Sequence, residues 1–290
     1  MCTKESGCLR IGIIGLGLIG GSLAMALRAA PGAEGDTIWA VERDAAVRCD
    51  ALDAGVVDAV FAELDEAPVE SADLTLLCLH PAACLDMLPR VAPRLAPGAV
   101  LSDVCGIKRP IAACARKALP PSADGPWFIG GHPMAGRERG GFSNATPTLF
   151  QRAHYLLCPE GAPEAAVERL RGLALRVGSR DVVLTDPDTH DANLAYTSQM
   201  MHVLALAICE QQPFAGSYGY EGNSFRGATR VAALEAALWT ELFWENREAL
   251  ARVLDELAGK LGEYRALLTG GDPEALARRL RETSGMKKRQ

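Results

Sequence analysis

The 290-residue sequence lacks an excess of basic side chains, because 30 Lys and Arg stand against 36 Asp and Glu and the net charge is −6. Sequence-independent binding to nucleic acid needs a basic footprint, which this balance does not provide. The same balance repels an anionic substrate at long range. We therefore expect any anion site to be built locally, from Arg, Lys, His or a helix N-terminus.

The sequence also lacks cysteine pairs at C-x-x-C spacing, a leader-like N-terminus and an uninterrupted apolar run of membrane-spanning length. Its nine cysteines are odd in number and several lie in apolar runs, as is typical of reduced thiols in a cytoplasmic protein. Their spacing disfavours a metal site, so we expect none. Residues 1–7 are short and polar, which predicts no signal peptide. The apolar residues 11–27 include five glycines, so we expect no membrane segment.

Strand and helix patterns alternate through the first part of the chain, which predicts a parallel α/β sheet. We expect strands at residues 9–14, 37–41, 74–79, 99–102, 128–129 and 155–158, and helices at 22–30, 44–54, 83–95 and 162–177. Later residues predict helices only, at 190–209, 228–268 and 274–282, before a basic tail that we expect to fray. We predict an α/β domain over residues 1–187 and an all-α domain over residues 188–290.

Gly15, Gly17 and Gly20 form a G-x-G-x-x-G motif between a predicted strand and a predicted helix. In a Rossmann-type loop the first glycine permits a tight turn, the second lets the backbone approach a pyrophosphate, and the third lets helix and strand pack closely. The pyrophosphate would lie at the helix N-terminus, against Leu18 and Ile19. A tight turn without a ligand is the structural alternative.

Glu42 follows the next predicted strand, 22 residues after Gly20. Its carboxylate can accept hydrogen bonds from ribose hydroxyls and repels a 2′-phosphate. The neighbouring Arg43 could instead hold such a phosphate. Glu42 therefore favours NAD as the cofactor, while Arg43 keeps NADP as an alternative.

Three further groups of polar residues could carry chemistry. His132, between glycines and a proline, predicts a rigid loop that presents an imidazole as general acid or base, although a structural histidine is the alternative. His190 reads as structural, after an N-cap at Asp188 or Thr189. The remaining residues could bind a ligand or pair within the protein, and they are Ser198, Gln199, His202, Arg226 and Arg230.

Together these segments resemble the prephenate/arogenate dehydrogenase family of tyrosine biosynthesis, over residues 11 to about 244. The resemblance is carried by residues 103–108, by Gly-His-Pro-Met-Ala-Gly at 131–136, by the helix motif that begins at His190, and by Phe-Arg-Gly-Ala-Thr-Arg at 225–230. It implies an N-terminal Rossmann-type domain, an all-α dimerisation domain, an NAD(P)-dependent oxidoreductase and a homodimer. The apolar positions Trp239, Leu242, Phe243 and Trp244 also favour a dimer through the helical domain.

The resemblance also implies roles for single residues. His132 would bind the ring hydroxyl of the substrate, and Arg226 would bind a substrate carboxylate. His202 would line the pocket with Ser198 and Gln199 and add positive potential. The residues beside the nicotinamide would be Leu79, His80 and Cys105. Where the family often has a serine that assists the histidine, this chain has Gly106.

The implied reaction is the oxidative decarboxylation of prephenate to 4-hydroxyphenylpyruvate with reduction of NAD. Loss of carbon dioxide restores aromaticity, so the reaction needs no metal. Arogenate dehydrogenase with NAD or NADP is one alternative. A different two-domain 3-hydroxyacid dehydrogenase is another, and the absence of lysine from residues 196–208 counts against its 6-phosphogluconate relatives. A non-catalytic dinucleotide sensor or scaffold does not explain the glycine-framed His132.

Overall fold

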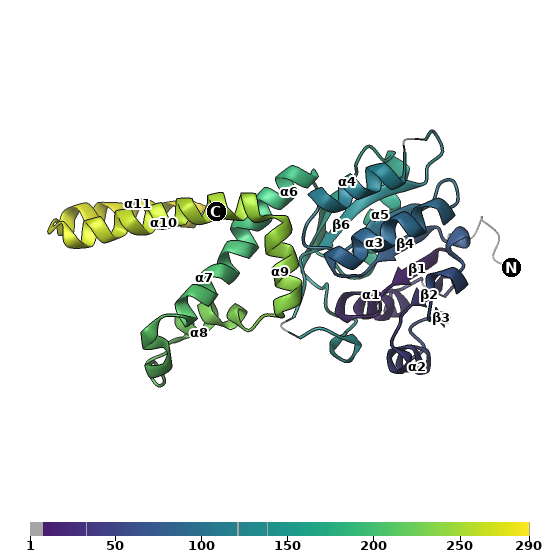
Figure 1. Ribbon diagram of the computed structural model, residues 1–290, viewed down its shortest axis with the longest axis horizontal. Helices are drawn as coiled ribbons and strands as arrows, with labels where there is room; N and C mark the ends of the chain where they lie inside the picture. The colour runs from purple at the N-terminus through teal and green to yellow at the C-terminus, as the bar shows by residue number, and fades with distance from the viewer. Residues whose placement is uncertain (1–7, 33, 121, 138, 290) are drawn as a thin grey trace.

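The computed structural model describes residues 8–32, 34–120, 122–137 and 139–289. Residues 1–7, on which the expectation about a signal peptide depends, lie outside the described residues. The N-terminal part is a sheet between layers of helices, and the C-terminal part is helical and extends away from it (Figure 1).

Eight strands form one sheet in the order β3-β2-β1-β4-β5-β6-β7-β8. They are β1 (Arg10–Ile14), β2 (Thr37–Val41), β3 (Ala59–Phe61), β4 (Leu74–Leu77), β5 (Val100–Asp103), β6 (Trp127–Pro133), β7 (His154–Cys158) and β8 (Asp181–Leu184). The strand order reverses between β1 and β4, and open α/β sheets bind dinucleotides at such a reversal. This arrangement confirms the Rossmann-type prediction.

Neighbouring strands pair in parallel except β6 and β7, so the prediction of a wholly parallel sheet is wrong at this pair. A parallel connection needs a crossover, which is usually a helix. Between β6 and β7 the described residues contain only a 3₁₀ turn, Phe142–Asn144. The chain therefore returns along the sheet in the opposite direction.

Helices cover both faces of the sheet. α1 (Leu18–Ala29), α2 (Ala45–Asp53) and α5 (Glu164–Arg176) share one apolar cluster, and α3 (Pro81–Val91) and α4 (Arg109–Ala118) share the other. Alternate strand residues point to opposite faces, so Ile13 belongs to the first cluster and Ile14 to the second. Burial on both faces explains why the strand sequences are almost entirely apolar.

Several boundaries differ from the sequence prediction. α1 begins at Leu18 rather than at residue 22, and β3, α4 and β8 were not predicted. β6 continues to Pro133, so His132 lies on a strand that pairs with β7 and not in a loop beyond it. Glycine has low strand propensity, which hid this extension because Gly130 and Gly131 interrupt the apolar pattern.

The described chain after β8 contains only helices. α6 (Pro187–Leu194), a π-helical segment (Ala195–Gln199) and α7 (Met200–Cys209) form one continuous helix, followed by α8 (Asn223–Thr229), α9 (Ala236–Glu245), α10 (Arg247–Thr269) and α11 (Pro273–Arg289). α10 and α11 form a hairpin that projects away from the sheet (Figure 1). The all-α prediction is confirmed.

The details of this helical part correct the sequence prediction. Asp186 caps α6 by accepting a hydrogen bond from Thr189 N at 2.9 Å, so the N-cap is neither Asp188 nor Thr189. The expected helix at residues 228–268 is divided among α8, α9 and α10, and the basic tail is helical to Arg289. The domain boundary between residues 187 and 188 stays a prediction. The two parts share apolar contacts, since Leu242 of α9 belongs to the apolar cluster of α3 and α4.

Candidate active site

A cleft of about 560 Å³ lies at the carboxyl ends of β1, β4, β5 and β6, with helices of the C-terminal part as its other wall. From the sheet side it is lined by Gly17, Leu18, Ile19, Leu79, His80, Cys105, Gly106 and His132. From the helical side it is lined by Ser198, Gln199, His202, Arg230, Glu235 and Trp239. The cleft therefore brings together most of the side chains that the sequence singled out.

The glycine loop has the backbone that a dinucleotide site requires. Gly15 has a φ of +95°, and a Cβ on Gly20 would lie 1.9 Å from the carbonyl oxygen of Gly15. These two glycines shape the turn but do not line the cleft. Gly17 caps α1 without a side-chain hydrogen bond, and a Cβ there would meet nothing within 4 Å. The N-terminus of α1 is thus open to an anion.

Glu42 lies beside this loop rather than in the lining of the cleft. Its carboxylate accepts hydrogen bonds from Leu16 N and Asp44 N, both at 2.9 Å. These bonds tie the end of β2 to the glycine loop. Arg43 is exposed, and its carbonyl oxygen accepts a hydrogen bond from Arg48.

The loops after β4 and β5 form the floor of the cleft. Cys105 is buried, its N–H donates to Asp103 Oδ2 at 2.9 Å, and its Sγ lies 3.5 Å from the carbonyl oxygen of Leu79. A Cβ on Gly106 would lie 3.9 Å from Cε1 of His132. A serine at this position would therefore contact the imidazole, and the chain has no hydroxyl there.

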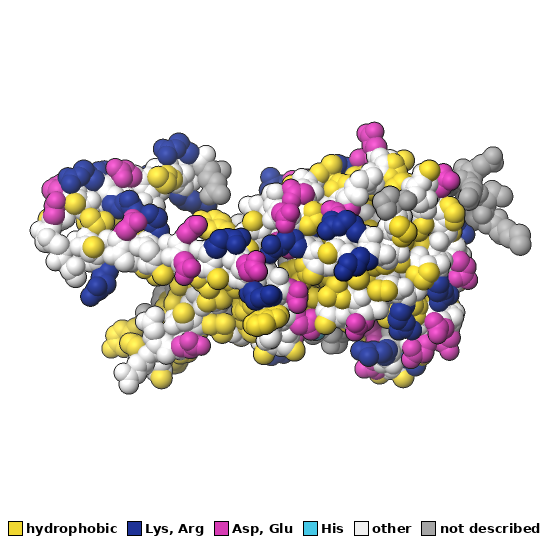
Figure 2. Space-filling view, turned by 45° about the horizontal axis from the view of Figure 1, so that its top comes forward, with side chains coloured by type: hydrophobic (Ala, Val, Ile, Leu, Met, Phe, Trp, Pro, Cys, Tyr) yellow, Lys and Arg dark blue, Asp and Glu magenta, His cyan; other side chains and the backbone are white. Residues whose placement is uncertain are grey.

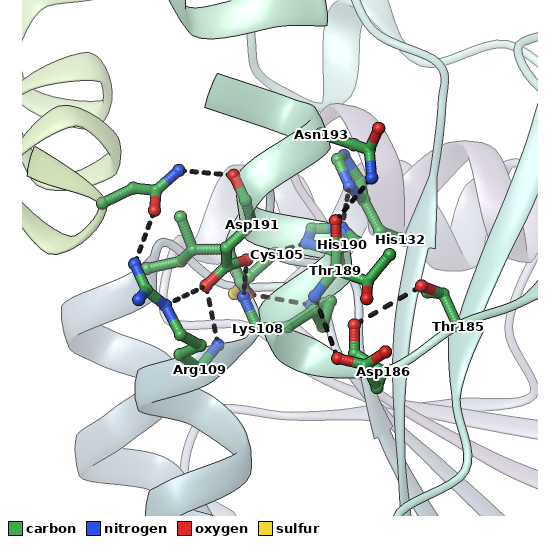
Figure 3. Close-up of polar contacts among 12 residues, drawn as sticks. Cys105, Lys108, Arg109, His132, Thr185, Asp186, Thr189, His190, Asp191 and Asn193 are labelled. Carbon is green, nitrogen blue, oxygen red and sulfur yellow. Dashed lines mark hydrogen bonds and ion pairs between the residues drawn. The ribbon is translucent and has the colours of Figure 1, made fainter. Parts of the chain in front are cut away.

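The imidazole of His132 is joined to two residues of α6 (Figure 3). Its Nδ1 lies 2.9 Å from Nε2 of His190, and Nδ1 of His190 lies 2.8 Å from Oδ1 of Asp191. Burial lowers the pKa of His132 well below its usual value, and His190 and Lys108 add to this effect. Burial also lowers the pKa of His190, against the opposing effect of Asp191. His190 thus contacts His132 directly. The sequence pattern, in which His190 follows a helix cap, did not indicate this contact.

Buried charges surround this chain of residues and are compensated. Asp191 accepts hydrogen bonds from the backbone N–H of Lys108 at 2.7 Å and of Arg109 at 2.9 Å, at the start of α4. Burial opposes its ionisation, but these bonds and the one from His190 lower its pKa. The buried ammonium of Lys108 pairs with Asp103, which raises the pKa of Lys108 despite burial.

His202 and Gln199 line the helical wall, and both have partners within the chain. His202 stacks on Trp239 with ring centroids 3.6 Å apart, and its Nδ1 donates to the carbonyl oxygen of Ser198 at 3.0 Å. Burial lowers the pKa of His202, so the ring is neutral at pH 7 and adds no positive charge. Gln199 donates to the carbonyl oxygen of Leu242 at 3.1 Å and accepts from Asn246 at 2.8 Å, so its amide joins helices rather than facing a ligand.

The two arginines of the 225–230 segment are separated by the structure. Arg226 is exposed on α8, donates to Oδ1 of Asn223 at 3.0 Å, and does not line the cleft. Arg230 follows α8 in a 3₁₀ turn and lines the cleft, close enough to His202 to lower the pKa of that ring. The assignment of Arg226 to a substrate carboxylate stays a prediction, and in this chain Arg230 is the arginine of the segment that lines the cleft. The two arginines are four residues apart in one segment, and the sequence around them gave no means of choosing between them.

Other residues of the cleft had no sequence signal that marked them. Arg137 and Glu235 are charged residues of its lining, and Trp239 forms part of its wall. Within the described ranges no group of three or more His, Cys, Asp or Glu could hold a metal ion. No helix in the described part of the chain is long and apolar enough to cross a membrane.

Comparison with known proteins places relatives beside this geometry. Residues 23–200 match the family described as prephenate dehydrogenase, nucleotide-binding domain, and residues 186–282 match prephenate dehydrogenase, dimerization domain. The cyclohexadienyl dehydrogenase of Zymomonas mobilis is 31% identical over 281 residues, which cover 94% of this chain and 93% of the relative. The prephenate dehydrogenase of Bacillus subtilis is 28% identical, over 92% of this chain and 72% of its own.

Solved structures give the same fold. The arogenate dehydrogenase of Synechocystis superposes with a TM-score of 0.82 at 27% identity, over 97% of this chain and 99% of its own. The prephenate dehydrogenase of Aquifex aeolicus, solved with hydroxyphenyl propionate and NAD⁺, superposes with a TM-score of 0.83 at 22% identity, over 99% of both chains.

Proposed function

The chain belongs to the prephenate dehydrogenase family of oxidoreductases, and from this premise we propose that it oxidises prephenate with NAD, releasing carbon dioxide and 4-hydroxyphenylpyruvate. The observation that carries the proposal is the position of His132. Its imidazole faces the same cleft as the open N-terminus of α1 and as Arg230. A base, a dinucleotide cradle and a carboxylate-binding side chain therefore share one space.

The residues present fit a dinucleotide. Gly17, Leu18 and Ile19 would hold the pyrophosphate at the start of α1, whose first turn carries no acidic residue. Glu42 would accept hydrogen bonds from the ribose and repel a 2′-phosphate, which favours NAD over NADP. When bound, NAD accepts the hydride that leaves C4 of the substrate ring. Leu79, His80 and Cys105 line the adjoining part of the cleft.

His132 is suited to take the proton of the substrate's ring hydroxyl. Its lowered pKa keeps the imidazole neutral at pH 7, so it is available as a base. A positioned base of this kind contributes roughly 10²–10⁴-fold in rate. Carbon dioxide then leaves from the quaternary ring carbon as the ring becomes aromatic, a step that the formation of the ring ketone makes possible.

Arg230 supplies the positive charge that a dianionic substrate needs in this acidic protein. A guanidinium can hold a carboxylate through two parallel hydrogen bonds. Arg137 adds a second cation to the cleft lining. Glu235 is the acidic residue of the described lining and would suit the ammonium of arogenate. Its two oxygens accept hydrogen bonds from Ala237 N and Leu238 N, which hold it at the start of α9. The two arginines of the described lining outnumber this carboxylate, so we favour prephenate, the more negatively charged of the two substrates.

A direct assay tests the proposal. Purified protein is mixed with NAD or NADP and with prephenate or arogenate, and the absorbance of the reduced cofactor is followed. We expect turnover with NAD and prephenate to exceed that of the other three combinations. If only arogenate is turned over, arogenate is the substrate instead of prephenate. If the cofactor is reduced in none of the four mixtures, the proposed dehydrogenase function is contradicted.

We also infer a homodimer formed through the helical part. Large side chains are exposed there, with Tyr218 91%, Tyr220 90% and Leu268 69% accessible in the single chain. Figure 2 shows apolar side chains at the surface of this part of the molecule. Light scattering at micromolar concentration should give twice the mass of one chain.

The eight cysteines of the described residues are free thiols, which supports a cytoplasmic location.

A further inference from the structure

We propose that His190 and Asp191 are positioning residues that hold His132 in the tautomer with its proton on Nδ1, leaving Nε2 to take the proton from the substrate. The inference deepens the proposed function and rests on it. It assigns a purpose to a buried pair on α6 that lies beyond the lining of the cleft. The pair reaches His132 through one hydrogen bond (Figure 3).

The tautomer follows from the direction of each hydrogen bond. Asp191 is ionised, so its carboxylate can only accept. Nδ1 of His190, 2.8 Å from Oδ1 of Asp191, must therefore carry the proton. His190 is neutral, so its Nε2 has a lone pair and accepts. Nδ1 of His132, 2.9 Å from that atom, must then be the donor.

This assignment leaves one nitrogen of His132 for chemistry. The ring is neutral, so a proton on Nδ1 means that Nε2 carries the free lone pair. A histidine with the other tautomer would present an N–H to the substrate hydroxyl and could not act as a base. Among the described residues, the hydrogen bond to His190 is the one that fixes this choice for the side chain of His132.

Gly106 explains why the arrangement matters in this chain. A side chain at this position would lie against Cε1 of His132, and glycine provides no polar group there. The hydrogen bond that orients the imidazole comes instead from His190 of α6. Asp191 is itself held by the backbone N–H groups of Lys108 and Arg109, so the position of His190 is fixed by the start of α4.

One carboxylate near the pair can offset the effects that lower the pKa of His132. The charged and titratable groups around it are His190 and Asp191 from α6, Asp103 from β5, Lys108 before α4, and Arg109 of α4, whose Nε lies 3.3 Å from Oδ2 of Asp191. Lys108 is paired with Asp103, so these two charges largely cancel. Asp191 meets Arg109 through Oδ2 and His190 through Oδ1, so its second oxygen can stabilise, through His190, the imidazolium formed when His132 takes a proton.

The first test reads the tautomer of His132 in the wild-type protein. The protein contains five histidines, so ¹⁵N-labelled histidine gives a spectrum that the His132→Asn variant can assign. At pH 7.5, we expect the nitrogen shifts and long-range couplings of His132 to show a protonated Nδ1 and a bare Nε2. A protonated Nε2 would overturn the inference. This readout does not depend on prephenate being the substrate.

The second test compares two substitutions of His190 in the intact enzyme. His190→Leu removes the acceptor, whereas His190→Gln can keep an amide oxygen close to the place of Nε2. We expect the leucine variant to lose about 10- to 100-fold in kcat with little change in KM, and the glutamine variant to recover most of this loss. NAD affinity and the thermal midpoint are measured for both variants.

The outcomes separate the inference from the proposed function. Equal kcat for wild type and His190→Leu, with NAD binding intact, would overturn the positioning role and leave the function standing. Equal losses in the leucine and glutamine variants would also overturn it, since a purely structural role predicts no rescue. If the leucine variant does not fold, the tautomer of the wild-type His132 decides the question. A wild-type enzyme that does not oxidise prephenate contradicts the function alone.

Discussion

The two walls of the cleft are built differently. On the sheet side, His132 sits on a strand within a connected set of buried hydrogen bonds that ends at the backbone of α4. On the helical side, Arg230 lies in a short 3₁₀ turn and is exposed. The imidazole is thus held by buried hydrogen bonds, whereas the arginine that we propose for the substrate carboxylate lies on an exposed turn.

This difference matches the two tasks. Proton transfer requires a base placed within hydrogen-bond reach, and small displacements are costly. Binding of a carboxylate by a guanidinium tolerates more movement, because the long side chain can adjust. Substitutions on the sheet wall should therefore act on kcat, and substitutions on the helical wall should act on KM.

The largest expected effect is on the sheet wall. His132→Asn removes the base, so kcat should fall by about two or more decades while NAD affinity stays nearly constant. Steady-state kinetics and NAD titration measure the two quantities. His154→Asn is a matched control, because His154 is exposed on β7 and pairs with Asp181. An unchanged kcat in His132→Asn would remove this residue from the mechanism.

A smaller effect, mainly on KM, is expected on the helical wall. Arg230→Ala should raise KM for prephenate about 10- to 100-fold, because a charge-assisted pair with a carboxylate is lost. Arg226→Ala serves as the control from the same segment and should change KM less than about twofold, as is usual for an exposed pair. The reverse order of the two variants would restore the original assignment of Arg226.

The cofactor end of the sheet wall should respond more weakly. Glu42→Gln keeps the shape of the side chain but removes the negative charge, so we expect KM for NAD to rise several-fold and the preference for NAD over NADP to decrease. Kinetics with both cofactors provide the measurement. A wild-type preference for NADP would instead assign the site to Arg43.

The smallest expected effect is the dependence of kcat/KM on pH. Because burial lowers the pKa of His132, the base stays deprotonated as pH falls through about 6.5, the usual value for histidine. We therefore expect kcat/KM to remain flat from pH 8 to 6.5 and to fall only at lower pH. Stability should also decrease below pH 6.5, since the unfolded chain then binds protons that His132 and His190 exclude in the folded state. An acid limb at or above pH 6.5 would contradict the lowered pKa.

Local patterns predicted much of the fold because they depend on neighbouring residues. The glycine loop and the strands at residues 9–14 and 37–41 could be read from period and turn chemistry alone. The extension of β6 to Pro133 and the helix α4 could not. Their residues acquire their conformation from pairing with β7 and from packing against α3, and both contacts join distant parts of the sequence.

By itself, the sequence determined that a dinucleotide cradle, a glycine-framed histidine and an arginine pair exist in one chain. Only the tertiary structure decided that Arg230 and not Arg226 reaches the cleft, that Gln199 joins helices, and that His190 contacts His132. The physical reason is that hydrogen-bond partners lie across the fold. His132 and His190 are 58 residues apart in sequence but 2.9 Å apart in space.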